Sequence, residues 1–406
     1  MHSMAHTRIR HLTEHYKELL GFSPLLGLLG HRQVGKTTFL ELNSKKYLTF
    51  DDEDTATEAT VSPKKFILRL KTPQTAIDES QLVPGIFPAL KERVRLSKRP
   101  GQIILSGSVR FTSKASIRES LTGRIQYLEL LPFSISELQG DPLTSRLDNI
   151  FKARTISSLA RDLDLNPSLQ SEKMKVMEHY MSKGGLPGLC FIRKDGLRRD
   201  KMLDQLKTIL DRDLRQIYRT RLTFDELVHY LSEMALFEGR PYDYQHFRRL
   251  TGLSPITQKQ LLYAFEAIFL IRRVPVEGDV NTFSIFLEDQ GESHFLSDGK
   301  LARSTQVMGL LYRNLRTEYF YRSGSSVNAF QFKNRSGSVV PMAFNAGDAV
   351  VGFLYSASAL PDRKTRGTAG VFLKYYANAK VIIVHEGQET HEIGPRVLSC
   401  PISCLI

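Results

Sequence analysis

Short apolar runs alternate with stretches of helical periodicity through the first third of the chain. A short apolar run bounded by turn residues is typical of a buried strand, whereas apolar residues three or four positions apart predict an amphipathic helix. The predicted strands are Leu25–Leu29, Lys46–Phe50, 74–79, Gln102–Ser108 and Ile125–Leu130. The predicted helices are His11–Leu20, one that begins near Lys36, Ser62–Leu70 and Pro84–Leu96. This alternation predicts an α/β domain with a parallel sheet over residues 1–140.

The pattern changes twice in the middle of the chain. From Asp141 to Asp213 the chain is polar with helical spacing, and we expect a helical lid or linker over residues 141–220. The next predicted elements are helices at Phe224–Leu236, Tyr242–Leu250 and Ser254–Phe265, and an apolar hairpin-like segment at Ile268–Pro275. Three helices and a hairpin in this order are the layout of a winged helix-turn-helix, which we assign to residues 221–295.

Composition and charge allow several folded domains and suggest an anionic partner. The chain has 406 residues, of which 41% are hydrophobic, and this excludes wholesale disorder. Its formal net charge is +13 at pH 7. Such a charge suits nucleic acid, although ordinary solubility charge explains it equally well until the charge is located.

The remaining composition points to the cytoplasm. The three cysteines, Cys190, Cys400 and Cys404, lack the spacing of a metal site and indicate a reducing compartment. No apolar run approaches the ~18 residues of a membrane span, and the first residues have no apolar core after their basic positions. We therefore expect a cytoplasmic protein with no membrane partner.

The segment after the first predicted strand carries the most specific chemical signal. Gly30 and Gly35 enclose four residues and precede Lys36 and Thr37, in the strand, glycine-rich loop and helix order of a phosphate-binding P-loop. The glycines let backbone N–H groups point at phosphate oxygens, Lys36 adds a positive charge, and Thr37 offers a hydroxyl to Mg²⁺. The predicted ATP-binding residues are Gly30, His31, Arg32, Gln33, Val34, Gly35, Lys36, Thr37 and Thr38.

Further catalytic candidates follow the other predicted strands. Asp78 would hold Mg²⁺ and Glu79 would polarise the attacking water, beside Lys36 as a catalytic cation; an ordinary exposed acidic pair is the alternative. Ser106 also ends a strand, where ligands of parallel sheets bind, and would sense the γ-phosphate or orient water, or merely cap the strand. Arg124, on a turn, could act as an arginine finger or be simply solvated.

The predicted winged helix carries side chains that suit DNA. Between Arg240 and Arg273 the chain has six Arg or Lys residues against Asp243 and Glu266. The predicted nucleic-acid contacts are Thr257, Gln258 and Lys259, which we expect to face outward from the third helix, together with Arg248 and Arg273. Winged helices also serve as protein contact modules, so a protein partner remains the alternative.

These features together resemble a known family. The matching phrases are GHRQVGKTT, YLTFDDED, AIDESQLVPGIFPALK, IILSGSVRF, SLTGRIQYLELLPFSISEL and GGLPG. They are similar to the AAA-type ATP-binding proteins of bacteria and archaea in which a P-loop domain precedes a C-terminal domain of unknown function. His31, Ser80 and Ser106 stand where that family usually has proline, isoleucine and threonine. None of these departures removes a phosphate or metal ligand, so the resemblance implies ATP hydrolysis.

The same resemblance implies a restriction-endonuclease-like α/β fold for residues 296–406. Such relatives often carry a helix Glu, an Asp and a Glu-x-Lys that bind a divalent metal and activate water. Here the corresponding positions hold Arg313, Pro341, Leu354 and Ser356. Because proline, leucine and serine cannot replace these groups, we expect an inactive domain that serves as a scaffold or binding surface.

The sequence therefore predicts a Mg²⁺-dependent P-loop ATPase in which ATP drives a switch or a remodelling step. Its expected partners are ATP with Mg²⁺, DNA through the winged helix, or a protein. A homo-oligomer also remains open, because AAA-type cores commonly form rings. The alternative is a nucleotide-gated binding or regulatory protein with negligible turnover.

Overall fold

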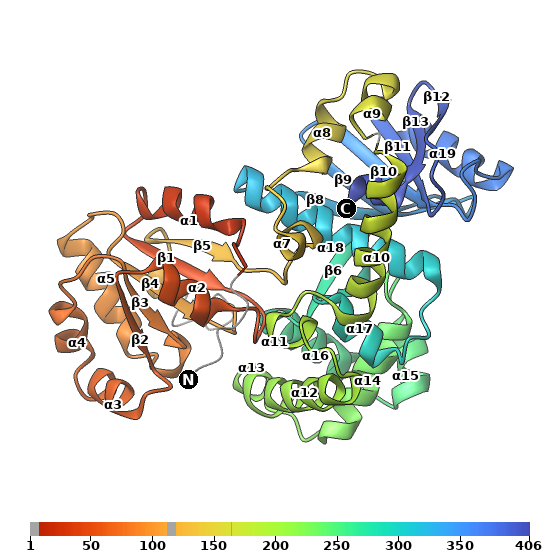
Figure 1. Ribbon diagram of the computed structural model, residues 1–406. Coiled ribbons are helices and arrows are strands. Elements are labelled where there is room, and N and C mark those ends of the chain that lie inside the picture. Colours follow the sequence, from red (N-terminus) through yellow and green to blue (C-terminus); the bar gives the residue numbers. More distant parts are fainter. Residues whose placement is uncertain (1–7, 112–118, 164) are drawn as a thin grey trace.

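Five parallel strands form the sheet of the N-terminal lobe in the computed structural model, which describes residues 8–111, 119–163 and 165–406 (Figure 1). The strands are β1 Leu25–Leu29, β2 Lys46–Thr49, β3 Thr75–Asp78, β4 Ile103–Gly107 and β5 Ile125–Glu129. Their order is β2-β3-β4-β1-β5, and every neighbouring pair is parallel. The predicted α/β class with a parallel sheet is confirmed.

Helices cover both faces of this sheet because alternate residues of a strand point to opposite sides. They are α1 Leu12–Leu20, α2 Lys36–Asn43, α3 Glu53–Val61, α4 Pro63–Arg69, the 3₁₀ turn η1 Ser80–Leu82 and α5 Ile86–Leu96. Leu26 and Leu28 of β1 share a core with α1 and α2, whereas Leu25 and Leu29 share another with α4 and α5. Helix α3 was not predicted from the sequence.

A second, eight-stranded sheet forms the centre of the second lobe, which comprises the described residues from 134 on. Its strands are β6 Ile271–Glu277, β7 Asp279–Leu287, β8 Asn328–Lys333, β9 Val339–Ala346, β10 Ala349–Tyr355, β11 Ala379–His385, β12 His391–Gly394 and β13 Val397–Pro401. The strand order is β12-β13-β11-β10-β9-β8-β6-β7, with parallel and antiparallel pairs. Helices α17 Gln290–Leu296 and α18 Arg303–Ser323 lie between β7 and β8 in the chain, and α19 Arg363–Tyr375 lies between β10 and β11.

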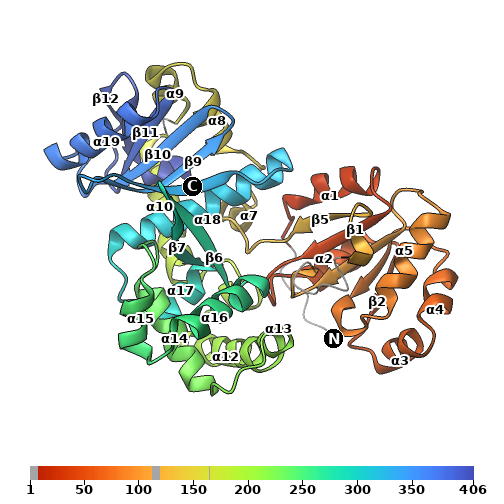
Figure 2. The ribbon, with the colours of Figure 1, turned by 180° about the vertical axis from the view of Figure 1, so that it is seen from behind.

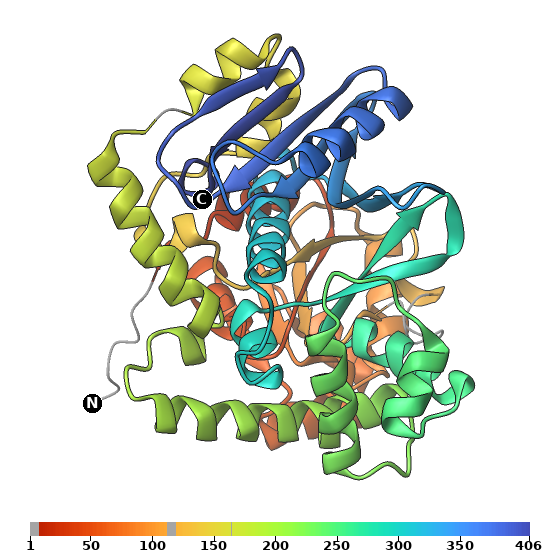
Figure 3. The ribbon, with the colours of Figure 1, turned by 90° about the vertical axis from the view of Figure 1, so that its right-hand side faces the viewer.

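The segment 141–220 does not form one lid or linker. Its helices, with α7 before them, are α7 Ile135–Gln139, α8 Arg146–Lys152, α9 Ile156–Asp162, α10 Pro167–Lys183, α11 Pro187–Cys190, α12 Asp195–Thr208, the π-helix η3 Ile209–Asp213 and α13 Leu214–Ile217. Leu147 and Ile156 are buried in the same core as Phe353 of β10, so α8 and α9 cover the large sheet. Helices α10 and α12 run along the outside of the second lobe (Figure 3).

The helices of the predicted winged helix are present with small shifts in their ends. They are α14 Phe224–Leu236, α15 Tyr244–Thr251 and α16 Pro255–Ala267. The hairpin that follows is β6 and β7 and is longer than the predicted Ile268–Pro275. Val276 of β6 also pairs with Gln331 of β8, so the hairpin is part of the large sheet (Figure 2).

Gln258 does not face outward as predicted. Its side chain is fully buried, accepts a hydrogen bond from the Tyr242 hydroxyl at 2.7 Å, and donates to the carbonyl oxygens of Leu253 at 2.8 Å and Tyr244 at 3.1 Å. Positions three and four residues apart share one helix face, and Gln258 shares its face with the buried Leu261. The structure therefore makes Gln258 a core residue.

The two lobes share a hydrophobic core. Leu26 and Val34 of the N-terminal lobe are buried in one cluster with Leu206, Leu210 and Tyr230 of the second lobe. A shared core of this kind holds the lobes in a defined arrangement. No helix within the described ranges is both long and apolar enough to cross a membrane.

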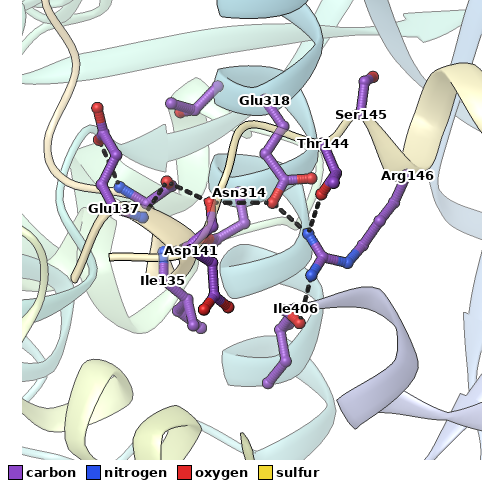
Figure 4. A network of polar contacts seen from close by, with 12 residues as sticks. Ile135, Glu137, Asp141, Thr144, Ser145, Arg146, Asn314, Glu318 and Ile406 are labelled. Atoms are coloured by element: carbon purple, nitrogen blue, oxygen red, sulfur yellow. Dashed lines mark hydrogen bonds and ion pairs between the residues drawn. The ribbon is translucent and has the colours of Figure 1, made fainter. Parts of the chain in front are cut away.

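Polar contacts also join α7 and α8 to α18 (Figure 4). The side chain of Asn314 on α18 accepts a hydrogen bond from the backbone N–H of Ile135 at 2.8 Å. Glu318, one turn further along α18, forms an ion pair with Arg146 at the start of α8. Buried charged and polar groups must be paired, so these contacts fix how the helices meet.

Replacement of Gln258 by leucine tests its structural role. We expect Gln258→Leu to lower the free energy of unfolding by about 1–3 kcal/mol, because the Tyr242 hydroxyl and two carbonyl groups each lose a buried hydrogen bond. Chemical denaturation measures this. The neighbouring exposed Lys259→Gln variant is the control and should change stability by less than about 0.5 kcal/mol. Unchanged stability of Gln258→Leu with weakened DNA binding would instead support a contact residue.

Candidate active site

The P-loop connects β1 to α2 at the carboxyl edge of the five-stranded sheet. Gly30 and Gly35 have φ angles of 155° and 95°, within the range that favours glycine. A Cβ on Gly30 would lie 2.3 Å from the carbonyl oxygen of Leu130, so the close approach of the two chain segments excludes any side chain there. The loop conformation required for phosphate binding is therefore encoded by these two residues.

Lys36 lies in the loop with its ammonium group directed at backbone oxygens. Its Nζ donates hydrogen bonds to the carbonyl oxygens of Gly30 at 3.0 Å and His31 at 2.9 Å. Burial lowers the pKa of Lys36, although the carboxylates of Glu79 and Asp78 oppose the effect. A buried cation next to the N-terminus of α2 suits the phosphates of a nucleotide.

The carboxylate of Asp78, at the end of β3, is the convergence point of the site. It accepts hydrogen bonds from the hydroxyls of Thr37 at 2.7 Å and Tyr47 at 2.9 Å, from the Ser106 hydroxyl, and from the backbone N–H of Glu79 at 3.0 Å. The predicted residues Asp78, Thr37 and Ser106 are thus brought together. Tyr47 was not predicted, because an aromatic residue in a strand is most often a packing residue.

Thr37 and Asp78 have the oxygen ligands that Mg²⁺ prefers. The cation is usually held by one or two protein oxygens together with phosphates and water, and an exposed hydroxyl next to a buried carboxylate provides such a pair. These two residues fit the predicted metal site. Elsewhere, the described part of the chain has no group of three or more His, Cys, Asp or Glu residues that could hold a metal.

Glu79 lies next to Asp78 in a left-handed backbone conformation, with φ at 51°. The Gln81 side chain donates a hydrogen bond to its carboxylate. Burial raises the pKa of Glu79, against the opposing effect of Lys36. A carboxylate with a raised pKa accepts a proton more readily near neutral pH, which suits a general base.

Arg124 is not brought to this site within one chain. It precedes β5, where Ile125 pairs with Leu25 at the amino end of β1, and its guanidinium donates to the Thr122 carbonyl at 2.9 Å. The P-loop is at the other end of β1, a separation of roughly 16 Å for five residues. Because parallel strands present their carboxyl ends to the ligand, the turn before β5 lies on the wrong edge of the sheet.

Two predicted P-loop residues pair with acids of the second lobe. Arg32 lies 3.2 Å from the carboxylate of Asp213, the last residue of the π-helix. The Nε2 of His31 lies 3.3 Å from the carboxylate of Glu292 on α17, and both side chains are fully buried. The two acids were missed because local sequence does not reveal which acid faces the loop.

Arg10 ties the loop to both lobes and was also missed. Its guanidinium donates to the carbonyl oxygen of Val34 at 3.0 Å and to the carboxylate of Glu137 at 3.1 Å. It also donates to the Leu131 carbonyl and lies 3.4 Å from the Tyr321 hydroxyl on α18. This buried guanidinium thus fixes the P-loop backbone relative to the second lobe.

A cavity of about 350 Å³ lies beside α2. Thr38, a predicted ATP-binding residue, lines it together with Ile9 and Leu42 from the N-terminal lobe and Pro187 from the second. Its mainly apolar lining and the presence of Gly35 in its wall suit a nucleoside whose phosphates would lie over the loop. Gln33 and Val34 belong to the loop backbone, where the Val34 side chain is buried.

The predicted nucleic-acid residues other than Gln258 are spread over three elements. Lys259 on α16 and Arg248 on α15 are exposed, and Thr257 lies in the first turn of α16. Arg273 on β6 is exposed but pairs with Glu266 at 3.0 Å.

The positions aligned with a nuclease motif lie in the large sheet and α18. Leu354 is buried in β10, Ser356 follows it, and Pro341 lies in β9. Arg313 is buried in α18 and forms an ion pair with Glu238. Arg313 stands where relatives with a nuclease motif carry the helix Glu, and its guanidinium is already paired with a carboxylate.

Exchange of His31 tests the contact between the loop and α17. Burial alone would lower the pKa of His31, but the facing Glu292 carboxylate outweighs it and the pKa is raised. A raised pKa stabilises the fold below about pH 6.5, and the contribution is lost as pH rises through the raised value. We expect the stability difference between the wild type and His31→Gln to shrink over that rise, as measured by denaturation. The exposed His229→Gln is the control, and a pH-independent difference would contradict the expectation.

The match to known proteins is clearest for the N-terminal lobe. Residues 23–139 match the family model described as an AAA domain. Two uncharacterized proteins, from Mycobacterium bovis and Mycobacterium tuberculosis, are each 30% identical over 127 residues, which is 31% of this chain and 29% of each relative. The aligned part is therefore well under half of those relatives.

Solved structures resemble the chain at low identity. The Walker-type ATPase of Pyrococcus abyssi is 18% identical with a TM-score of 0.41, covering 71% of this chain and 95% of that one. AMPPCP-bound DnaA from Aquifex aeolicus is 13% identical with a TM-score of 0.25, covering 63% and 85%. Residues 23–139, which contain the five parallel strands, therefore resemble an AAA domain.

Proposed function

We propose that the protein binds ATP with Mg²⁺ in the N-terminal lobe and hydrolyses it. The observation that carries this proposal is the convergence of Thr37, Tyr47 and Ser106 on the Asp78 carboxylate, directly beside Glu79 and the buried Lys36. Binding alone would need the loop and a cation. A half-buried carboxylate with a raised pKa at the same edge adds a base for the attacking water.

Each residue would have a distinct role. The backbone N–H groups between Gly30 and Gly35 would bind phosphate oxygens, and Lys36 would exchange its loop carbonyls for the β and γ phosphates. Thr37 and Asp78 would hold Mg²⁺, which neutralises developing negative charge on the phosphates. Glu79 would take a proton from water, while Ser106, bonded to Asp78, would orient that carboxylate.

The contacts of the loop with the second lobe support an ATP-driven switch. Lys36 holds the carbonyl of His31, whose ring faces Glu292, and the adjacent Arg32 pairs with Asp213. Phosphates that attract Lys36 and Arg32 would compete with these contacts. Occupation of the loop would thereby change how α17 and the π-helix are held.

DNA is the proposed partner of the winged-helix unit. The order of three helices and a hairpin supports this, as do the exposed Lys259 and Arg248. The burial of Gln258 removes one of the expected base contacts, so phosphate contacts would account for most of the affinity. A regulatory protein that binds ATP with negligible turnover is the competing function.

Replacement of Glu79 separates these functions. We expect Glu79→Gln to reduce the rate of ATP hydrolysis by roughly 10²- to 10⁴-fold while ATP binding is retained, because the base is lost and the loop is kept. Lys36→Ala should lose binding itself. Steady-state phosphate release and nucleotide-binding titration are the measurements, with Glu92→Gln on α5, a partly exposed acid outside the site, as control. A negligible rate in the wild type would favour the regulatory protein.

Hydrolysis in the presence of DNA tests the partner. We expect duplex or single-stranded DNA to raise the steady-state rate, and the stimulation to fade at higher salt because phosphate contacts release counterions. The measurement compares rates with and without DNA at two salt concentrations. A rate that DNA leaves unchanged at both concentrations would direct attention to a protein partner.

A further inference from the structure

Four arginines line a cavity of about 490 Å³ between the lobes, which has no P-loop residue in its lining. Arg110 comes from the segment after β4, Arg272 and Arg273 from β6, and Arg316 from α18. Tyr263 of α16 and residues 326–329 complete much of the wall. The chain thus brings guanidinium groups from both lobes to one hollow, which we call the arginine cleft.

The arginine cleft contains more positive than negative charge. Glu288 pairs with both Arg272 and Arg316, and Glu129 pairs with Arg272 and lies 3.8 Å from Arg110. Three guanidinium groups therefore share two carboxylates. The fourth, that of Arg273, has its own partner in Glu266.

The shared carboxylates leave part of this charge without a partner. The Nε of Arg316 is buried and has no hydrogen-bond partner among the described residues. Burial lowers the pKa of Arg272 to about 10. Attraction by Glu288 opposes this effect, and repulsion from Arg316 and Arg110 adds to it. Guanidinium groups crowded in this way would be stabilised by an additional anion.

The surroundings of the cleft favour a nucleic-acid strand as that anion. Tyr263 is 51% exposed and offers an aromatic face at the rim. Lys259, one turn earlier on the same face of α16, and the half-exposed Arg273 continue the basic surface outward. An aromatic ring between cations is the arrangement that binds a base and its phosphates, whereas an isolated phosphate would need no ring.

We propose that the arginine cleft binds the sugar-phosphate backbone of a nucleic-acid strand that runs from α16, with a base stacked on Tyr263. This deepens the proposed DNA contact of the winged-helix unit and rests on it, but it does not require ATP turnover. It adds residues of the N-terminal lobe to the contact surface. Arg110 also donates from Nε to the Glu266 carbonyl at 3.1 Å, so this wall of the cleft is attached to the end of α16.

Binding of a fluorescein-labelled single-stranded oligonucleotide to the full chain, followed by anisotropy without ATP, tests the proposal. Tyr263→Ala removes an exposed ring and should weaken binding by roughly five-fold or more. Arg110→Gln should weaken binding and reduce the slope of log affinity against log salt by about one. The exposed Arg366→Gln on α19 removes the same charge elsewhere and should leave the affinity unchanged.

The outcomes separate the cleft from the proposals on which it rests. Circular dichroism shows whether each variant is folded. If Arg110→Gln does not fold, the oligonucleotide affinity of Tyr263→Ala alone tests the proposal. Unchanged affinity in Tyr263→Ala, with weaker binding in Lys259→Gln, would overturn the cleft and keep the winged-helix contact. Absence of oligonucleotide binding by the wild type, or loss in all variants including Arg366→Gln, would also overturn the cleft. Neither result would bear on the rate of ATP hydrolysis measured without DNA.

Discussion

The candidate active site depends on the fixed position of one carboxylate, that of Asp78. Hydroxyls from α2, β2 and β4 and one backbone N–H all donate to its two oxygens. A carboxylate held by several donors needs little reorganisation when a cation approaches, and this lowers the cost of binding Mg²⁺. The short strand β3 places this group, because its four buried residues lie between β2 and β4. The position of Glu79 follows from that of Asp78.

The P-loop is also held in place, by contacts that include residues of the second lobe. Arg10 binds the carbonyl of Val34, Arg32 pairs with Asp213 in the π-helix, and His31 faces Glu292. A π-helix is a wide turn that often occurs at functional sites, and here it directs an acid at the loop. Glu292 and Asp213 are buried, so breaking either of these ion pairs leaves a buried acid without its partner and is costly. We therefore expect the conformation of the loop and the position of its partners in the second lobe to change together.

The local parts of this arrangement could be predicted from the sequence, and the distant parts could not. Gly30, Gly35 and Lys36 were recognised because a P-loop is a contiguous motif with fixed spacing. Arg32 and Asp213 are separated by 181 residues, and no local pattern indicates such a pair. Gln258 was placed outward because it is polar, but Tyr242 and two backbone carbonyls satisfy it in the core. Arg124 was assigned to the site without knowledge of the sheet edge on which it lies.

The strand β4 gives the molecule a direct path from the nucleotide site to α16. Its end carries Ser106, which donates to Asp78, and four residues later the backbone N–H of Arg110 donates to the Ala267 carbonyl at 2.8 Å. Only the segment from Ser106 to Arg110 separates the two contacts. Few residues are therefore available to accommodate a shift of Ser106 with the Asp78 carboxylate. The proposed phosphate site and the last turn of α16 are thus held by contacts of one short segment of the chain.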